Sequence, residues 1–284
     1  MKKYLYILTA SLLITACEDV IDVEVTSEEP RLIIDALIRV DPNEEFTKVV
    51  VKVSQTSSFF ESTTPVTLEQ ISLSNLDFPR DTIDPDTLNE ESPGSGIYTK
   101  TFETSFLTAG ELVLMIEYEG EIFVARTSYV RTNNFNSIEQ GDGNLFGDEE
   151  TEIVVNFKDI PEEDNFYLFD FDFAEYLVTE DTFYQGQDFG FSYFYDEKLD
   201  SGQELSISIM GVEESFYNYM DQLIEQSGDD FGPFATPAAT VRGNFINGTE
   251  IDGEDVLDSV ENPNNFALGY FAICETFTQT FIVE

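Results

Sequence analysis

Carboxylates dominate the side chains in this sequence that could do chemistry. The chain has 57 Asp and Glu residues against 13 Lys and Arg residues, with no His and no Trp. Without His it lacks the commonest general base and the commonest metal ligand, and Ser–His or Cys–His nucleophile pairs cannot form. What remains is acid–base catalysis by paired acids, or the binding of hard cations by oxygen.

The paired acids have simpler explanations than catalysis. Asp170 and Asp172 are expected to point the same way from one strand, as the two acids of a glycosidase could. Oxygen ligands for calcium could come from two acidic loops, one with Asp142, Asn144, Asp148 and Glu150, the other with Asp252, Glu254 and Asp255. Neither loop has EF-hand spacing, and solvated acidic surfaces explain all three patterns. We expect no catalytic residue, no metal and no cofactor; a hydrolase that uses carboxylates is an alternative.

The residues with the most definite chemistry are at the start of the chain. Lys2 and Lys3 precede an apolar run from Tyr4 to Ala16, which is typical of an export signal. The run is too short to span a membrane, which takes about 20 residues. Ile14-Thr15-Ala16-Cys17 resembles the lipobox of bacterial lipoproteins. That resemblance implies that residues 1–16 are a cleaved signal peptide and that Cys17 carries acyl chains such as palmitate. An ordinary signal peptide with an incidental cysteine is the alternative.

The second cysteine and the net charge restrict the chemistry and the binding partners of the remaining chain. Once Cys17 is lipidated, Cys274 has no partner within the chain, and its apolar surroundings predict a buried, inert thiol. The net charge is −44 and becomes more negative when the signal, with its two lysines, is removed. Such a surface repels nucleic acids and anionic headgroups, which excludes nucleic-acid binding, and it suits a saline host.

Alternating apolar residues predict a mainly β protein with two β-sandwich-like domains. Residues 17–30 are expected to form an acidic tether. Period-2 runs at 32–40, 49–53 and 112–118 then predict an immunoglobulin-like or transthyretin-like domain over residues 31–134. The polar, glycine-containing stretch 135–150 is interpreted as a linker.

Residues 151–284 are expected to form the second β domain. Its aromatic residues from Phe166 to Tyr176 could stack on sugars, but their strand period favours a core. The spacing of Phe216, Met220, Leu223 and Ile224 predicts one amphipathic helix over residues 213–226. An edge strand is expected at 241–246, and two closing strands at 266–274 and 276–284.

Loop motifs suggest sites of glycosylation. Asp81-Thr82-Ile83, Asp86-Thr87-Leu88 and Asp258-Ser259-Val260 resemble the O-glycosylation motif of Bacteroidota, which makes Thr82, Thr87 and Ser259 candidate acceptors. Asn247-Gly248-Thr249 fits the N-glycosylation triplet, which also occurs often by chance.

Three stretches carry a likeness to a larger family. They are the acidic start behind Cys17 with Pro30–Ile38, the segment Phe157–Pro161 with Asn165-Phe166-Tyr167, and Pro263–Phe271 preceded by Tyr217–Met220. Together they resemble domain-of-unknown-function family 4249 of Bacteroidota outer-membrane lipoproteins. The resemblance implies an association with TonB-dependent transporters and supplies no catalytic residues.

We therefore expect a non-enzymatic, lipid-anchored outer-membrane protein that helps a TonB-dependent transporter to capture its ligand. Glu18-Asp19 behind the lipidated cysteine resembles the surface-export signal of Bacteroidota lipoproteins, so the cell surface is the expected location. A structural or adhesive surface lipoprotein without a transporter partner is the alternative.

Overall fold

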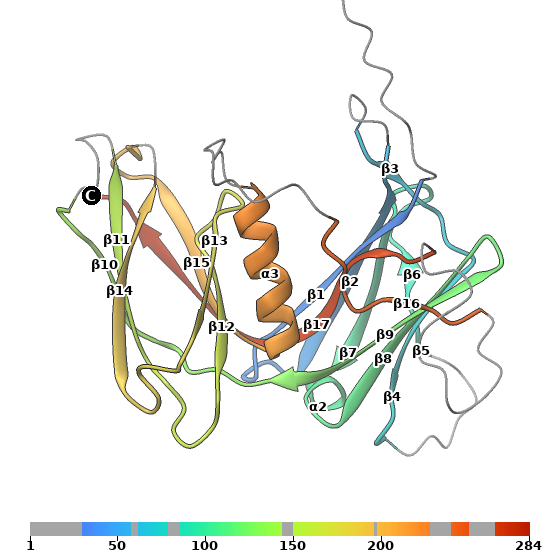
Figure 1. The fold of residues 1–284 in the computed structure, drawn as a ribbon, viewed down its shortest axis with the longest axis horizontal. Coiled ribbons are helices and arrows are strands. Elements are labelled where there is room, and N and C mark those ends of the chain that lie inside the picture. The colour runs from blue at the N-terminus through green and yellow to red at the C-terminus, as the bar shows by residue number, and fades with distance from the viewer. Residues whose placement is uncertain are drawn as a thin grey trace, which may run out of the picture.

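The computed structural model describes residues 30–57, 62–78, 86–143, 150–195, 198–227, 240–249 and 265–284. It confirms a mainly β protein with one long helix, α3 (Glu214–Ser227), which begins and ends one residue later than predicted. The short helix α2 (Thr104–Leu107) is the other helix of the described residues. Two strand-rich halves lie on either side of α3 (Figure 1).

The strands of the first half wrap around a shared core. They are β1 (Leu32–Val40), β2 (Phe46–Gln55), β3 (Thr64–Pro65), β4 (Gln70–Asn75), β5 (Asp86–Thr87), β6 (Asn89–Glu90), β7 (Ile97–Glu103), β8 (Glu111–Tyr118) and β9 (Glu121–Val130). With the last strand, β17 (Leu268–Ile282), the sheet runs β4-β8-β9-β17-β1-β2-β7. The segment 86–90 pairs with β4 through β5 and with β7 through β6, so it connects the two ends of this row.

The core of the first half follows directly from sequence alternation. Leu32, Ile34, Ala36, Ile38 and Val40 of β1 all face inward and are at most 4% exposed. Val49, Val51 and Val53 of β2 and Leu112, Leu114 and Ile116 of β8 do the same. Burying every second side chain fixes the register, because a slip by one residue would expose the whole apolar set.

The second half is a sandwich of two sheets with an aromatic core. Its strands are β10 (Phe135–Gln140), β11 (Thr151–Lys158), β12 (Phe166–Asp170), β13 (Tyr176–Glu180), β14 (Asp188–Tyr195) and β15 (Glu204–Val212). One sheet has the order β10-β11-β14, and the other has β13-β12-β15-β17. Phe157, Tyr167, Phe169 and Phe171 are fully buried between them, which supports the core interpretation of the aromatic stripe.

Four local expectations need correction. The first six residues of the expected linker form β10, because Phe135 is buried and the segment pairs with β11. The expected edge strand at 241–246 is reduced to β16 (Ile246–Asn247), which pairs with β9. The motif Asp86-Thr87-Leu88, which was expected in a loop, begins with strand β5 and is followed by β6. Phe173 leaves the aromatic stripe and is 57% exposed, since Asp172, Phe173 and Ala174 turn the chain with positive φ.

The closing segment is one strand instead of two. The start of β17 runs parallel to β1, its middle touches β9, and its end pairs with β15 of the second half. Phe271 and Ile273 face the first core, Cys274 belongs to a cluster beside α3, and Phe277 packs against the second core. One strand therefore contributes to both halves of the molecule.

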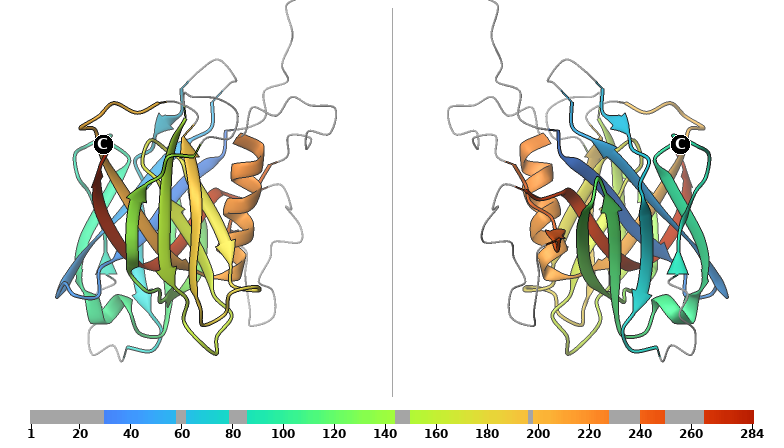
Figure 2. Two further views of the ribbon diagram at one scale, coloured as in Figure 1. Left: turned by 90° about the vertical axis from the view of Figure 1, so that its left-hand side faces the viewer. Right: turned by 90° about the vertical axis from the view of Figure 1, so that its right-hand side faces the viewer.

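Helix α3 covers the junction from one flank, as the side views show (Figure 2). Its buried residue Phe216 packs on Tyr270 of β17, with ring centroids 4.7 Å apart. Tyr217, Tyr219 and Met220 pack against the same cluster. The helix is held by its apolar face, since an isolated helix of this length would be marginal in water.

Candidate functional site

The residues with the most definite predicted chemistry lie outside the described part of the chain. They are Cys17, the predicted lipidation site, with Thr82 and Ser259, two of the predicted O-glycosylation sites. The third, Thr87, lies in strand β5 opposite Ser72 of β4 and is half-buried, whereas the sequence predicted a loop. Asn247 is buried and accepts hydrogen bonds from the backbone N–H and hydroxyl of Thr249, at 3.0 and 2.6 Å.

Asp170 and Asp172 do not form the expected pair on one strand. Asp170 ends β12, and Asp172 lies in the turn that follows. The Asp170 carboxylate accepts a hydrogen bond from the Asp172 N–H at 3.0 Å, and Asp172 accepts one from the Ser206 N–H at 3.0 Å. The Asp170 carboxylate therefore holds the turn to the end of β12, and the Asp172 carboxylate holds the turn to β15.

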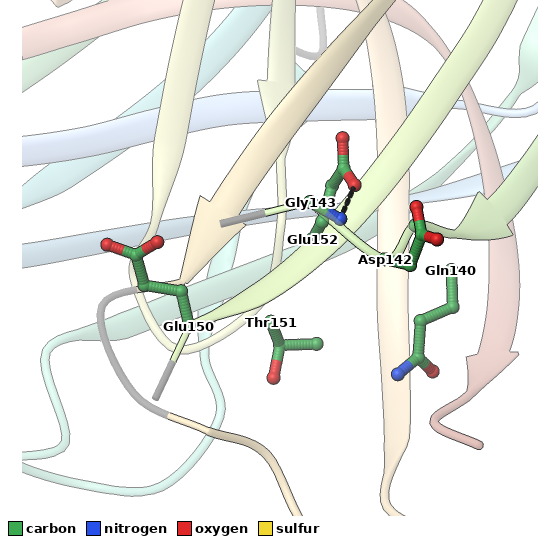
Figure 3. A pocket seen from close by; sticks show the side chains of 7 residues that line it. Gln140, Asp142, Gly143, Glu150, Thr151 and Glu152 are labelled. Carbon is green, nitrogen blue, oxygen red and sulfur yellow. Dashed lines mark hydrogen bonds between the residues drawn. The ribbon is translucent and has the colours of Figure 1, made fainter. Parts of the chain in front are cut away.

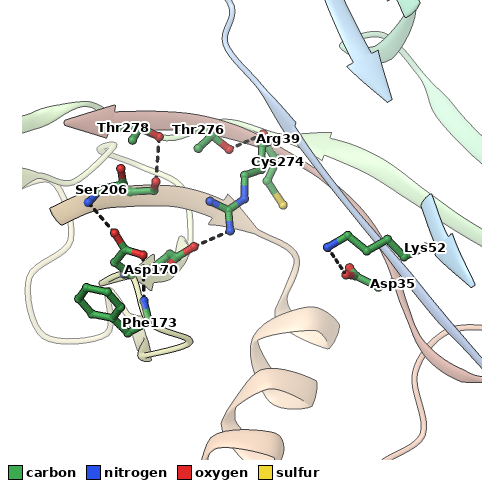
Figure 4. A network of polar contacts seen from close by, with 11 residues as sticks. Asp35, Arg39, Lys52, Asp170, Phe173, Ser206, Cys274, Thr276 and Thr278 are labelled. Atoms are coloured by element: carbon green, nitrogen blue, oxygen red, sulfur yellow. Dashed lines mark hydrogen bonds and ion pairs between the residues drawn. The ribbon is translucent and has the colours of Figure 1, made fainter. Parts of the chain in front are cut away.

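The second oxygen of Asp170 joins the two halves. It forms an ion pair with Arg39 of β1, in which Nη2 of Arg39 lies 2.6 Å from Oδ2 of Asp170 (Figure 4). The two residues are 131 positions apart in the sequence. The Asp170 side chain is 13% exposed and that of Arg39 is 39% exposed. The neighbouring pair of Lys52 and Asp35 is longer, at 3.6 Å, and both of its side chains are mostly exposed.

Two phenols and the Cys274 thiol lie near the residues of these two ion pairs. Burial raises the pKa of Tyr176, the charge of Asp170 raises it further, and Arg39 lowers it. Burial, with a smaller effect of Asp35, raises the pKa of Tyr219 on α3 to about 12. Cys274 is buried, as the sequence predicted, and this burial also raises the pKa of its thiol. The raised pKa values keep these phenols and this thiol neutral at physiological pH.

Two buried or half-buried glutamates fix the junction elsewhere. Glu275 of β17 is 9% exposed and accepts a hydrogen bond from the Thr132 N–H at 2.9 Å. Glu213, just before α3, accepts hydrogen bonds from the Thr127 hydroxyl and the Ser128 N–H, both at 3.1 Å. These contacts tie the end of β9 to β17 and α3. A glutamate inside the apolar run of β17 was the one sequence signal for such a contact.

A separate acidic pocket lies at the far end of the second half. It is lined by Gln140, Gly141, Asp142, Gly143, Glu150, Thr151 and Glu152 (Figure 3). Glu152 accepts a hydrogen bond from the Gly143 N–H at 2.7 Å, which holds the pocket's backbone in place. Asp142 and Glu150 of the predicted calcium loop do line it, whereas Asn144 and Asp148 lie outside the described residues.

Three further observations concern metal ligands, membrane-spanning helices and exposed apolar side chains. Among the residues that the structure describes, no three His, Cys, Asp or Glu side chains are grouped so that they could hold a metal ion. In the same residues, no helix is both long and apolar enough to cross a membrane. The exposed apolar side chains include Phe173 and Phe183, which is 90% exposed in the loop after β13. Such residues suit contact with another molecule.

A family model matches most of the chain. Residues 18–280 match the family model described as Domain of unknown function (DUF4249). No curated protein matches this chain significantly. The matched region covers nearly the whole sequence and includes both halves, the shared strand β17 and helix α3.

Proposed function

The chain belongs to the DUF4249 family, and we propose that it is a lipid-anchored protein of the bacterial outer membrane. Cys17 is its lipidation site, and it serves a TonB-dependent transporter as a non-enzymatic accessory that helps to capture ligand. The observation that carries the proposal is the export signal that ends in Ile14-Thr15-Ala16-Cys17. Each CH₂ that enters the membrane contributes about 0.8 kcal/mol, so two or more acyl chains anchor a protein stably.

The folded part of the chain is consistent with such an anchor. Strand β1 begins at Leu32, so only about fifteen residues separate the proposed lipid from the β structure. That spacing would keep the acidic body within a short distance of the membrane surface. Its strong negative charge opposes adsorption to anionic headgroups, which leaves the lipid as the attachment.

The anchor can be tested with a matched pair of cysteine variants. Cys17→Ala should abolish lipidation and move the protein from the detergent-rich to the aqueous phase in a detergent-partition assay. Cys274→Ala, which changes the chain's other cysteine, should partition like the wild type. A Cys17→Ala protein that stays fully membrane-bound would refute the lipid anchor.

The surface location needs a separate measurement. Intact cells expressing the wild type should lose the protein to added proteinase K, and replacing Glu18 and Asp19 by Gln and Asn should protect it. Equal protection of both forms would place the protein on the inner side of the membrane.

The transporter partnership is tested by crosslinking in native outer membranes, followed by purification through this chain. Recovery of a large outer-membrane barrel in stoichiometric amount supports the accessory role. Exposed aromatic residues such as Phe183 would equally serve an adhesive surface protein. Binding to cells or matrix, without a barrel partner, would establish that second function instead.

A further inference from the structure

Three buried polar residues lie directly after β11, directly before β12 and directly after β13. Asp159 is 0% exposed, Asn165 is 7% exposed and Asp181 is 4% exposed. Each of these side chains carries oxygen atoms that could bind a cation. None of them forms a salt bridge with a Lys or Arg among the described residues. Buried carboxylates of this kind are rare unless a partner compensates their charge.

Strand pairing brings Asn165 and Asp181 side by side. Phe166 pairs with Glu180, and the Asp181 N–H donates to the Asn165 carbonyl at 3.1 Å, which extends that pairing by one residue. Directly opposed residues have side chains on the same face, with Cβ atoms about 5 Å apart. That face is the one occupied by Tyr167 two residues further on, so both side chains point towards the core.

Tyr167 connects Asp159 to the same place. Its hydroxyl donates a hydrogen bond to one oxygen of Asp159. The other oxygen of Asp159 accepts a hydrogen bond from the Gly186 N–H at 2.6 Å. Asp159 is also close enough to Asp181 for its charge to raise the pKa of that carboxyl group, although burial is the larger cause.

Two oxygens at this place lack any donor. They are Oδ1 of Asn165 and Oδ2 of Asp181, which are both buried and accept no hydrogen bond from the protein. A buried polar group without a partner costs about 1–3 kcal/mol, and more if it is charged. Two neighbouring buried acceptors that receive no hydrogen bond are an arrangement that a cation would satisfy.

We propose that Asp159, Asn165 and Asp181 bind a divalent hard cation of the calcium class. The ligands are all oxygens, and two carboxylates match the charge of such an ion. Water and backbone carbonyls would complete the six to eight ligands that calcium takes. The site differs from a cluster of three acids because one of its three side-chain ligands is a neutral amide. It is also separate from the acidic pocket and independent of the transporter proposal.

The test uses the full chain, purified in detergent and stripped with a chelator, at an ionic strength that screens the acidic surface. Calcium at a hundredfold excess over its Kd should raise the Tm by about 5 °C. Asp181→Asn keeps the shape and removes the ligand charge, so it should abolish that rise. Glu152→Gln, which removes one acid from the acidic pocket, should retain it.

Terbium luminescence provides a second readout of the same site. With no Trp in the chain, excitation of tyrosine should sensitise bound Tb³⁺ through Tyr167, which bonds to the ligand Asp159. Asn165→Leu leaves the charge unchanged and should weaken this signal at least about tenfold, which keeps the test informative if Asp181→Asn fails to fold. Equal stabilisation by calcium of the wild type, Asp181→Asn and Asn165→Leu would overturn the proposal. So would stabilisation by acid alone without any calcium effect, since a protonated Asp181 would then satisfy the site.

Discussion

At the scale of single residues, the contact with the greatest reach is the ion pair of Arg39 and Asp170. It joins β1 of the first half to the end of β12 in the second. No local pattern in the sequence predicts it, because the partners are 131 residues apart and Asp170 looks like one acid among many. The strand alternation around Asp170 predicted Asp172 as its functional partner, whereas its ion-pair partner is Arg39.

A double-mutant cycle measures what this pair contributes. Arg39→Met should lower the free energy of unfolding by about 1–3 kcal/mol, because it leaves the mostly buried Asp170 carboxylate without its cation. Combined with Asp170→Asn, the cycle should give a coupling energy of about 1 kcal/mol. The control cycle uses Lys52→Met and Asp35→Asn, an exposed pair at 3.6 Å that should couple by less than about 0.5 kcal/mol. Urea titrations provide all the values, and equal coupling in the two cycles would contradict the special role of the junction.

Cys274 provides a probe of folding, because its thiol is buried and its pKa is raised. In the Cys17→Ala variant it is the one cysteine left in the chain. At pH 8 a thiol-reactive dye should label it only after denaturation, since the thiolate that reacts is disfavoured in the folded state. Because the folded thiol keeps its proton, unfolding should also become easier as the pH rises above the ordinary thiol pKa. Rapid labelling of the native protein would show that the strand opens locally.

At the scale of elements, strands with one buried face were the most predictable. The inward residues of β1, β8 and β11 alternate strictly, and the helix pattern at Phe216 and Met220 placed α3 to within one residue. The strand β17 was predicted as two strands, because seven consecutive residues from Tyr270 to Thr276 are buried and alternation disappears there. Burial on both faces arises from tertiary contacts, which the local pattern does not contain.

The close approach of β17 to β1 depends on Gly269. Its φ is +93°, and a Cβ atom there would lie 2.0 Å from the carbonyl oxygen of Ile34. Gly269→Ala should therefore lower the free energy of unfolding by about 3 kcal/mol or more, through backbone strain and a clash with β1. Gly202 has a similar φ of +87° with no atom near a Cβ, so Gly202→Ala isolates the strain and should cost about 1–2 kcal/mol. Similar losses in denaturant titrations would mean that the spacing between β17 and β1 is not tight.

At the scale of the whole molecule, the two halves are less separate than the sequence suggested. The strand β17 pairs with β1 and β9 on one side of the junction and with β15 on the other. The expected linker contributes β10 to the second sandwich. A boundary inferred from composition marks a polar stretch of chain, and it does not reveal which strand returns from the far end of the sequence to complete a sheet.

This shared strand predicts that the first half does not fold alone. Residues 30–134 lack β17, so β1 and β9 lose their common neighbour and the core loses Phe271 and Ile273. The fragment should show no cooperative thermal transition, whereas the whole chain should unfold in one step with matching calorimetric and van't Hoff enthalpies. The matched control joins residues 240–276 to this fragment through a Gly-Ser linker, which restores β16 and the first part of β17 and should recover a cooperative transition. A fragment 30–134 that unfolds cooperatively by itself, or two separate transitions in the whole chain, would show that the two halves fold as independent domains despite the strand they share.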